Sequence, residues 1–171
     1  MEHDGRRLLI LTGKSSEQGA ELLNSIPSLE RELQCSIQVM RADRVFGRDH
    51  VASAFMKAVR AFANDDNVSD SITLETMIYM SGRRQIQEAL ALMGVEDDTR
   101  EIVCISTCDG TDAPEIAKEL GLEIDESILE DMQGKDADAF VSGTKKGADI
   151  KGSKVLDMVL ERVSKVDILK R

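Results

Sequence analysis

Two adjacent arginines, Arg83 and Arg84, give the clearest chemical signal in this sequence, because they follow Ser81 and Gly82 at the expected beginning of a helix. The first amide protons of a helix have no partner, so positive charge is unfavourable there and acidic side chains are preferred. Free amides, a hydroxyl group and two guanidinium groups together suit a phosphate. The pattern therefore predicts an anion site.

Three consecutive helical segments would hold this site in place. Apolar residues recur every three or four positions over residues 49–63, which predicts a helix with one apolar stripe. A second helix is expected after Ser71, a good N-terminal cap, and it would end at Gly82. The third is expected from about residue 83 to residue 93, with Gly94 just beyond its end.

Two more cations could extend the anion site from the polar side of the first helix. Lys57 and Arg60 stand three positions apart and fall on that side together with His50. The alternative is that the paired arginines form ordinary ion pairs on the surface. The acidic residues expected within reach are Asp70, Glu75 and Glu88.

The distribution of charge is compatible with a polyanionic partner, although the chain as a whole is acidic. Its 171 residues carry a formal net charge of −10, which argues against a general nucleic-acid-binding protein. Residues 41–94, however, hold seven basic and seven acidic residues, out of 22 and 32 in the whole chain. All of the net negative charge therefore lies outside this stretch, and a locally neutral surface can still meet RNA.

No set of residues predicts catalysis or metal binding. The two histidines are isolated, and no Ser or Cys lies near a base in sequence, so we expect a non-catalytic protein without a metal or cofactor. Cys35, Cys104 and Cys108 form no CxxC pair, and we interpret them as free thiols in a reducing cytoplasm. No apolar run reaches membrane-spanning length, and the polar start does not indicate a signal peptide, so no membrane partner is expected.

The rest of the chain predicts a small sheet covered by helices. Short apolar runs at residues 8–11 and 102–105 indicate two strands, and the alternation of Ile37, Val39 and Arg41 with Gln38 and Met40 indicates another between them. Helical patterns occupy most of the remaining sequence. We therefore expect an α+β fold, with a helical majority packed on a mainly antiparallel three-stranded sheet, in one domain spanning residues 1–171.

The last element is expected to be a helix from about residue 153 to residue 166. Its apolar residues form one stripe along the helix. This stripe can pack on the sheet, or part of it can cover a partner. Its members are Val155, Leu156, Val159, Leu160 and Val163.

The stretch from Arg41 to Gly94 resembles the Cgi-type subunit of the KEOPS complex, also called the PRPK-binding protein family. The shared pattern is Ala-Asp…Phe-Gly…His…Ala followed by Glu…Tyr…Ser-Gly-x-Arg-Gln-Ile…Ala…Gly, and it covers roughly a third of the chain. The matching residues are Ala42, Asp43, Phe46, Gly47, His50, Ala54, Glu75, Tyr79, Ser81, Gly82, Arg84, Gln85, Ile86, Ala89 and Gly94.

The resemblance implies a non-catalytic role in tRNA modification. KEOPS complexes install a threonylcarbamoyl group on the adenosine beside the anticodon, and the chemistry belongs to a metal-containing subunit of the ASKHA type. The Cgi-type subunit binds a small atypical kinase that behaves as an ATPase, and it grips the single-stranded 3′ CCA end of the tRNA. A member of this family would be a cytoplasmic accessory subunit without a small-molecule substrate.

The resemblance also suggests which residues form the two interfaces. Tyr79 or His50 could stack on a base, and the stripe of the last helix is expected to dock on the kinase. Two alternatives stay open: a regulator of the kinase without RNA contact, and a regulatory domain that binds a phosphorylated small molecule. The residues expected to contact tRNA are Arg48, Lys57, Arg60, Ser81, Arg83, Arg84 and Gln85.

Overall fold

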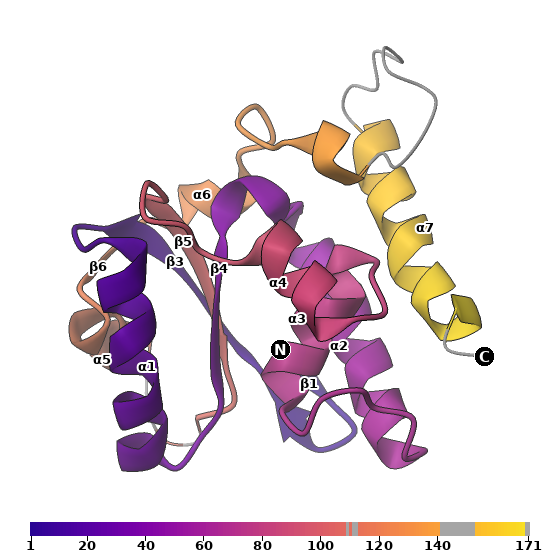
Figure 1. Ribbon diagram of the computed structural model, residues 1–171, viewed down its shortest axis with the longest axis horizontal. Coiled ribbons are helices and arrows are strands. Elements are labelled where there is room, and N and C mark those ends of the chain that lie inside the picture. Colours follow the sequence, from indigo (N-terminus) through magenta and orange to yellow (C-terminus); the bar gives the residue numbers. More distant parts are fainter. Residues whose placement is uncertain (109, 111–112, 141–152, 170–171) are drawn as a thin grey trace.

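The computed structural model describes residues 1–108, 110, 113–140 and 153–169, and it shows the expected α+β fold (Figure 1). Its centre is a four-stranded antiparallel sheet with the strand order β4-β5-β3-β6. The edge strand β6 was not expected, and neither was a separate two-stranded hairpin formed by β1 and β2. The strands are β1 (Glu2–His3), β2 (Arg6–Arg7), β3 (Leu9–Ser15), β4 (Ile37–Arg41), β5 (Glu101–Ser106) and β6 (Leu122–Ile124).

Strand β5 shows why the expected run at residues 102–105 is apolar throughout. Ile102 and Cys104 belong to the hydrophobic core on one face of the sheet, whereas Val103 and Ile105 belong to the core on the other face. Successive side chains of a strand point to opposite faces. Because both faces are covered, every position of this run must be apolar.

Helices cover both faces of the sheet (Figure 1). Helices α1 (Gly19–Leu33) and α5 (Ala113–Glu119) lie on one face. The other face is covered by α2 (Gly47–Ala63), α3 (Ile72–Ser81) and α4 (Ile86–Met93). The remaining short elements are η1 (Ala42–Arg44), α6 (Ser127–Glu130) and η2 (Ala137–Phe140).

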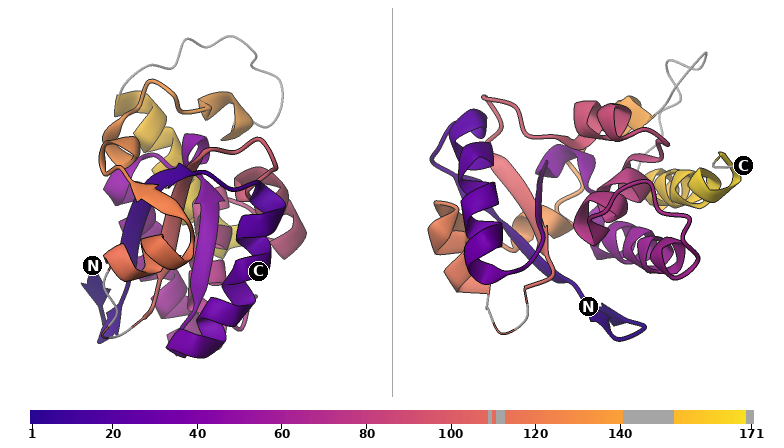
Figure 2. Two further views of the ribbon diagram at one scale, coloured as in Figure 1. Left: turned by 90° about the vertical axis from the view of Figure 1, so that its left-hand side faces the viewer. Right: turned by 60° about the horizontal axis from the view of Figure 1, so that its bottom comes forward.

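The last helix, α7 (Ser153–Leu169), lies outside α2 and α3, on the side away from the sheet (Figures 1 and 2). Its apolar stripe therefore packs on two helices rather than on the sheet, and the helix continues three residues beyond the expected end at residue 166. The buried residues of α7 that join this core are Val155, Val159, Val163 and Val166.

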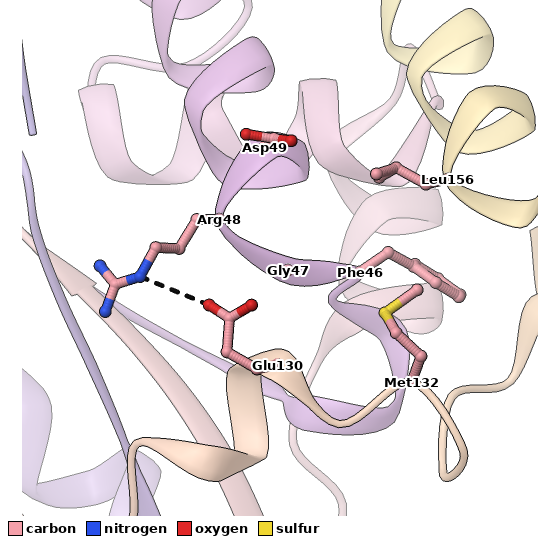
Figure 3. A pocket seen from close by; sticks show the side chains of 7 residues that line it. All are labelled: Phe46, Gly47, Arg48, Asp49, Glu130, Met132 and Leu156. Carbon is pink, nitrogen blue, oxygen red and sulfur yellow. Dashed lines mark ion pairs between the residues drawn. The ribbon is translucent and has the colours of Figure 1, made fainter. Parts of the chain in front are cut away.

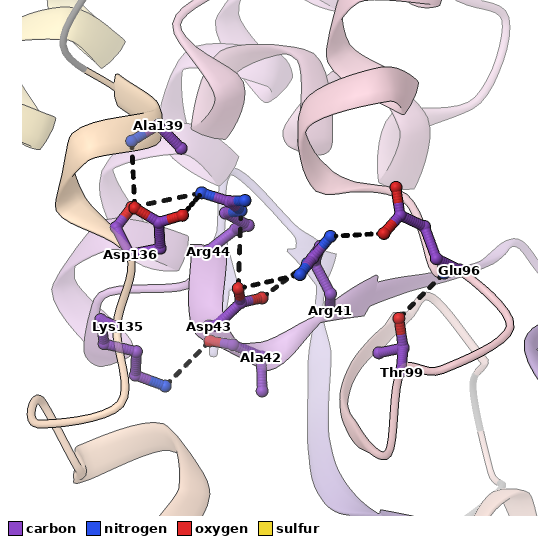
Figure 4. Close-up of polar contacts among 9 residues, drawn as sticks. All are labelled: Arg41, Ala42, Asp43, Arg44, Glu96, Thr99, Lys135, Asp136 and Ala139. Atoms are coloured by element: carbon purple, nitrogen blue, oxygen red, sulfur yellow. Dashed lines mark hydrogen bonds and ion pairs between the residues drawn. The ribbon is translucent and has the colours of Figure 1, made fainter.

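A network of ion pairs holds the connection between β4 and α2 (Figure 4). Arg41 bonds Asp43 at 2.7 Å and Glu96 at 2.9 Å, while Arg44 pairs with Asp136 at 2.5 Å. The hydrogen bond to Asp43, more than the other neighbours, raises the pKa of Arg41 above its ordinary value. The network joins three segments that are distant in sequence, and it thereby fixes where α2 begins.

His50 is completely buried, although the helical spacing placed it on the polar side of its helix. Its Nδ1 accepts from the amide of Phe46 at 3.2 Å, so the neutral ring carries its proton on Nε2, which donates to the carbonyl of Met80 at 2.9 Å. Its ring centroid lies 6.1 Å from that of Phe140. Burial lowers the pKa of His50 to about 4. His50 therefore ties the start of α2 to the end of α3 and cannot stack on an RNA base.

Cys35 and Cys108 form a disulfide bond, with their Cα atoms 4.8 Å apart. Ile37 pairs with Ser106 in the antiparallel register of β4 and β5, and continuing this register by two residues places the two cysteines opposite each other. The expectation of free thiols is therefore wrong for this pair, while Cys104 is free and buried. Spacing along the chain could not reveal the pair, because it depends on the strand register.

Candidate nucleic-acid and partner interface

The two arginines lie in the turn between α3 and α4. Gly82 ends α3 with a φ of 64°, in the left-handed region, and Gln85 is the extended residue before α4 begins at Ile86. The expectation that this helix begins at Arg83 is therefore wrong. Because Arg83 and Arg84 also follow the C-terminal end of α3, where cations are favourable, the electrostatic penalty behind the predicted anion site is smaller than expected.

Both guanidinium groups are nevertheless available to an anion. Arg84 is exposed and Arg83 is partly exposed, and neither forms an ion pair with another residue that the structure describes. Of the acids expected as surface partners, Glu75 is buried and accepts hydrogen bonds from the amides of Val68 and Ser69 at 2.9 and 3.0 Å. Within the described part of the chain, the alternative of ordinary surface ion pairs for the two arginines is not observed.

A third arginine, Arg162 of α7, lies beside this turn. A Cβ atom added to Gly82 would lie 3.0 Å from the Cβ of Arg162, so the glycine allows α7 to approach closely. Burial, together with the charge of the nearby Arg83, lowers the pKa of Arg162. Two cations that disfavour each other in this way are stabilised when an anion binds beside them. Local sequence patterns could not indicate Arg162, because it belongs to a helix much further along the chain.

Lys57 and Arg60 form a second group, on α2, and both pair with Asp167 of α7. The Nζ atom of Lys57 lies 3.0 Å from Oδ2 of Asp167, and the guanidinium of Arg60 contacts the same oxygen. The side chain of Lys57 is 18% exposed and that of Arg60 is 57% exposed. Their charges are therefore partly satisfied within the chain, although Arg60 also faces solvent.

Arg48 lies near the beginning of α2, beside a cavity of about 520 Å³ (Figure 3). Its guanidinium pairs with Glu130 at 3.5 Å, and both side chains are exposed. Phe46, Met132 and Leu156 provide the apolar part of the cavity lining. The cations expected to contact RNA thus fall into three groups, each with its own neighbours.

Ser81 and Tyr79 have their polar groups engaged inside the chain. The hydroxyl of Ser81 donates to the carbonyl of Ile78 at 2.7 Å and accepts from the amide of Arg83 at 3.1 Å. Both residues are 1% exposed, so the ring of Tyr79 cannot stack on a base and Ser81 can act only by shaping the turn. Gln85, by contrast, is exposed.

The apolar stripe of α7 divides into a buried part and an accessible part. Val155, Val159 and Val163 are buried against the chain's own helices. Leu156 and Leu160 are partly exposed, and Leu156 also lines the cavity beside α2. A partner that contacts this helix without displacing it would therefore meet the two leucines and not the three valines.

The described residues were also compared with the requirements of a metal site and of a membrane-spanning helix. Among them, no group of three or more His, Cys, Asp or Glu side chains is placed to hold a metal ion. Of the helices that the structure describes, none combines the length and the apolar character needed to cross a membrane.

Comparison with known proteins finds relatives along most of the chain. The family described as kinase binding protein CGI-121 matches residues 14–146. A regulatory protein Cgi121 of Methanocaldococcus jannaschii is 29% identical over 154 residues, which cover 90% of this chain and 95% of the relative. An EKC/KEOPS complex subunit CGI121 of Coccidioides immitis is 28% identical over 78 residues, which cover 46% of this chain and 36% of the relative.

Proposed function

The chain belongs to the CGI-121 family of kinase-binding proteins, and on this basis we propose that it is an accessory subunit of a KEOPS complex that binds the small atypical kinase of that complex. The resemblance carried by residues 41–94 is confirmed by this family match, which extends from residue 14 to residue 146. The family is regulatory rather than enzymatic, so the expected non-catalytic role is also confirmed. The fungal relative, named as a subunit of an EKC/KEOPS complex, supports the choice of complex.

We further propose that the chain recruits tRNA through its 3′ CCA end for threonylcarbamoyladenosine modification. One observation carries this proposal: Arg84 is exposed beside Arg83, without an ion pair to any described residue, on a chain whose net charge is −10. Arginine binds phosphate through a planar fork of donors that matches two oxygen atoms at once. Arg162 adds a third positive charge beside this turn, and the exposed amide of Gln85 can bond a base or sugar edge.

The kinase-binding surface is proposed to lie on α7, within one domain that also carries the tRNA-binding turn. Leu156 and Leu160 are the members of its stripe that face outward in part. Leu156 borders an apolar-lined cavity together with Met132, which is 38% exposed. Such accessible apolar side chains around a hollow are typical anchors for a partner, because they are fully removed from water when the complex forms.

The two halves of the proposal are tested together by mixing the full chain with the kinase-like subunit and tRNA. An immobilised chain should retain the kinase, and the pair should retain tRNA at low salt. Retention of the kinase without any tRNA, even at low salt, would identify a pure kinase-binding regulator. Thermal stabilisation by nucleotides or phosphate, without retention of either partner, would identify a domain for a phosphorylated small molecule.

A cytoplasmic location is proposed from the tRNA substrate alone. The argument from free thiols no longer supports it, because Cys35 and Cys108 are joined in a disulfide. Disulfides in the cytosol are characteristic of hyperthermophiles and are otherwise rare. Cell fractionation with an antibody against the chain tests the location, and recovery in an extracellular fraction would contradict it.

A further inference from the structure

Three donors from two helices converge on the single carboxylate of Asp167. Lys57 lies 3.0 Å from its Oδ2 atom, Arg60 contacts the same oxygen, and the hydroxyl of Tyr79 donates to Oδ1 at 2.6 Å. The donors come from α2 and α3, whereas Asp167 belongs to α7. We call Lys57, Arg60 and Tyr79 the anion cradle.

The position of Asp167 is not one that helix energetics favours. It lies in the last turn of α7, which ends at Leu169, and the unpaired carbonyls of that turn disfavour a negative charge. The cradle also places two cations on the one carboxylate of Asp167. Both features indicate that the site is arranged for an anion, and that Asp167 fills it.

We propose that the anion cradle binds a backbone phosphate of RNA, and that Asp167 occupies the place of this phosphate in the RNA-free chain. This inference rests on the proposed tRNA-binding function. It adds Asp167 as a competitor of the RNA, and it adds Tyr79 to Lys57 and Arg60 as a donor to the phosphate. A phosphodiester carries one negative charge, like a carboxylate, and it presents two oxygen atoms to donors in a similar way. Lys57, Arg60 and Tyr79 can therefore exchange one anion for the other without any change in their own positions.

The exchange requires only the end of α7 to move. Val155, Val159, Val163 and Val166 are buried and anchor the helix up to the residue before Asp167, so only the chain from Asp167 onward has to open. Ile168, the next residue after Asp167, is 72% exposed and holds the last turn weakly. Local opening of a helix end costs little free energy compared with unfolding of the core.

The electrostatics of the site agree with an exchange between two anions. Burial acts to raise the pKa of Asp167, but the hydrogen bonds from Tyr79 and Lys57, with the charges of Lys57 and Arg60, outweigh it and leave the pKa below its ordinary value. The carboxylate is therefore ionised near neutral pH. RNA must displace a charged competitor, and removal of that charge should strengthen RNA binding.

Asp167→Asn in the full chain tests this competition, because the amide keeps the shape of the side chain and an acceptor for Tyr79 while it removes the charge. Asp157→Asn is the matched control, since Asp157 is exposed on the same helix and the change in net charge is identical. Affinity for transcribed tRNA is measured by gel shift between low and moderate salt. Asp167→Asn should bind about fivefold more tightly than the wild type, while Asp157→Asn should stay within about twofold.

The salt dependence of tRNA affinity shows whether Asp167→Asn binds an additional phosphate or only changes the stability of the chain. With the cradle open, the slope of log affinity against log salt should steepen by about 0.7, the value for one contact on a single strand. Adding Lys57→Gln to Asp167→Asn should remove both gains. If Asp167→Asn binds no more tightly than Asp157→Asn while the wild type still shifts tRNA, the inference is wrong and the proposed function stands. If no form shifts tRNA, both are wrong.

A second measurement does not depend on how well the variant folds. In the wild-type chain, tRNA should speed hydrogen exchange at the amides of the last turn of α7, because Asp167 is displaced, while amides around Val159 remain protected. Equal or slower exchange in the last turn on tRNA binding would overturn the inference.

Discussion

The hydroxyl of Tyr79 donates to Asp167 at 2.6 Å, and this bond joins α3 to the last turn of α7 across 88 residues of sequence. A hydrogen bond to a charged acceptor in a partly buried place stabilises more than one between neutral groups. The contact therefore stabilises the fold as well as forming part of the anion cradle. It is one of the polar contacts that hold the last helix on the body of the protein, alongside the buried valines.

Replacing Tyr79 with Phe should lower the free energy of unfolding by about 2 kcal/mol, because the ring is kept and its hydroxyl no longer donates to a charged acceptor. Urea denaturation of the wild type and the variant measures the difference. Tyr79→Phe and Asp167→Asn should each destabilise the chain, and together by less than the sum, since both act on the same contact. Additive effects would show that the contact contributes little.

Kinase binding should be sensitive to the outward-facing leucines of α7. A chain with Leu156→Gln and Leu160→Gln should bind the kinase-like subunit about tenfold more weakly, because two apolar anchors of the proposed interface become polar. Lys154→Gln, an exposed position on the same helix, introduces the same side chain and serves as the control. Isothermal titration with the purified kinase measures both. Equal affinity of the double variant and the control would show that these leucines of α7 are not part of the kinase interface.

Acid should destabilise the chain through His50. The pKa of this residue is about 4 in the folded protein, chiefly because of burial, against 6.5 for an ordinary histidine. The unfolded chain therefore binds more protons between these two values. The contribution of His50 is fully present above pH 6.5, falls as the pH decreases through the window, and is lost below about pH 4. The loss amounts to about 3 kcal/mol.

Denaturation curves of the wild type and His50→Gln between pH 7 and pH 4 isolate this effect, because carboxylates contribute equally to both proteins. The difference in stability between the two proteins should shrink as the pH falls. A difference that stays constant across this range would show that His50 is not the group responsible.

Reduction of the disulfide should also destabilise the chain. The bond between Cys35 and Cys108 closes a loop over 73 residues of sequence separation, and loop entropy assigns such a cross-link about 4 kcal/mol. Urea denaturation with and without a reducing agent measures the loss. Cys35→Ser should be as unstable as the reduced wild type and should not respond to the reducing agent. A wild type that is equally stable in both conditions would contradict the prediction.

The elements that could be predicted from the sequence are those with a clear apolar period. The runs that became β3 and β5 were found because both faces of each strand are buried, which leaves short apolar stretches, whereas β4 was found from the alternation of its residues. Strand β6 was missed because only Leu122 is buried, while Glu123 and Ile124 are exposed on an edge strand within an acidic segment. Strands β1 and β2 have two residues each, and such short strands show no periodic pattern.

The candidate site could be predicted only in part, because its geometry depends on contacts between distant segments. Helical spacing assigns one apolar stripe to α2, but this helix is also covered near its start by Phe140, so His50 is buried. Lys57 and Arg60 were expected as free cations, and Asp167 could not be foreseen as their partner without knowing where α7 packs. Arg162 was missed for the same reason.

Four affinity measurements show most directly whether the turn between α3 and α4 binds the 3′ end of tRNA. The wild type and Arg84→Ala are each titrated with tRNA that carries or lacks its CCA end, at low salt. We predict that Arg84→Ala weakens binding of intact tRNA about tenfold, flattens its salt dependence, and has almost no effect on the shortened tRNA. An equal loss with both RNAs, or unchanged affinity of Arg84→Ala for intact tRNA, would show that this turn does not bind the 3′ end.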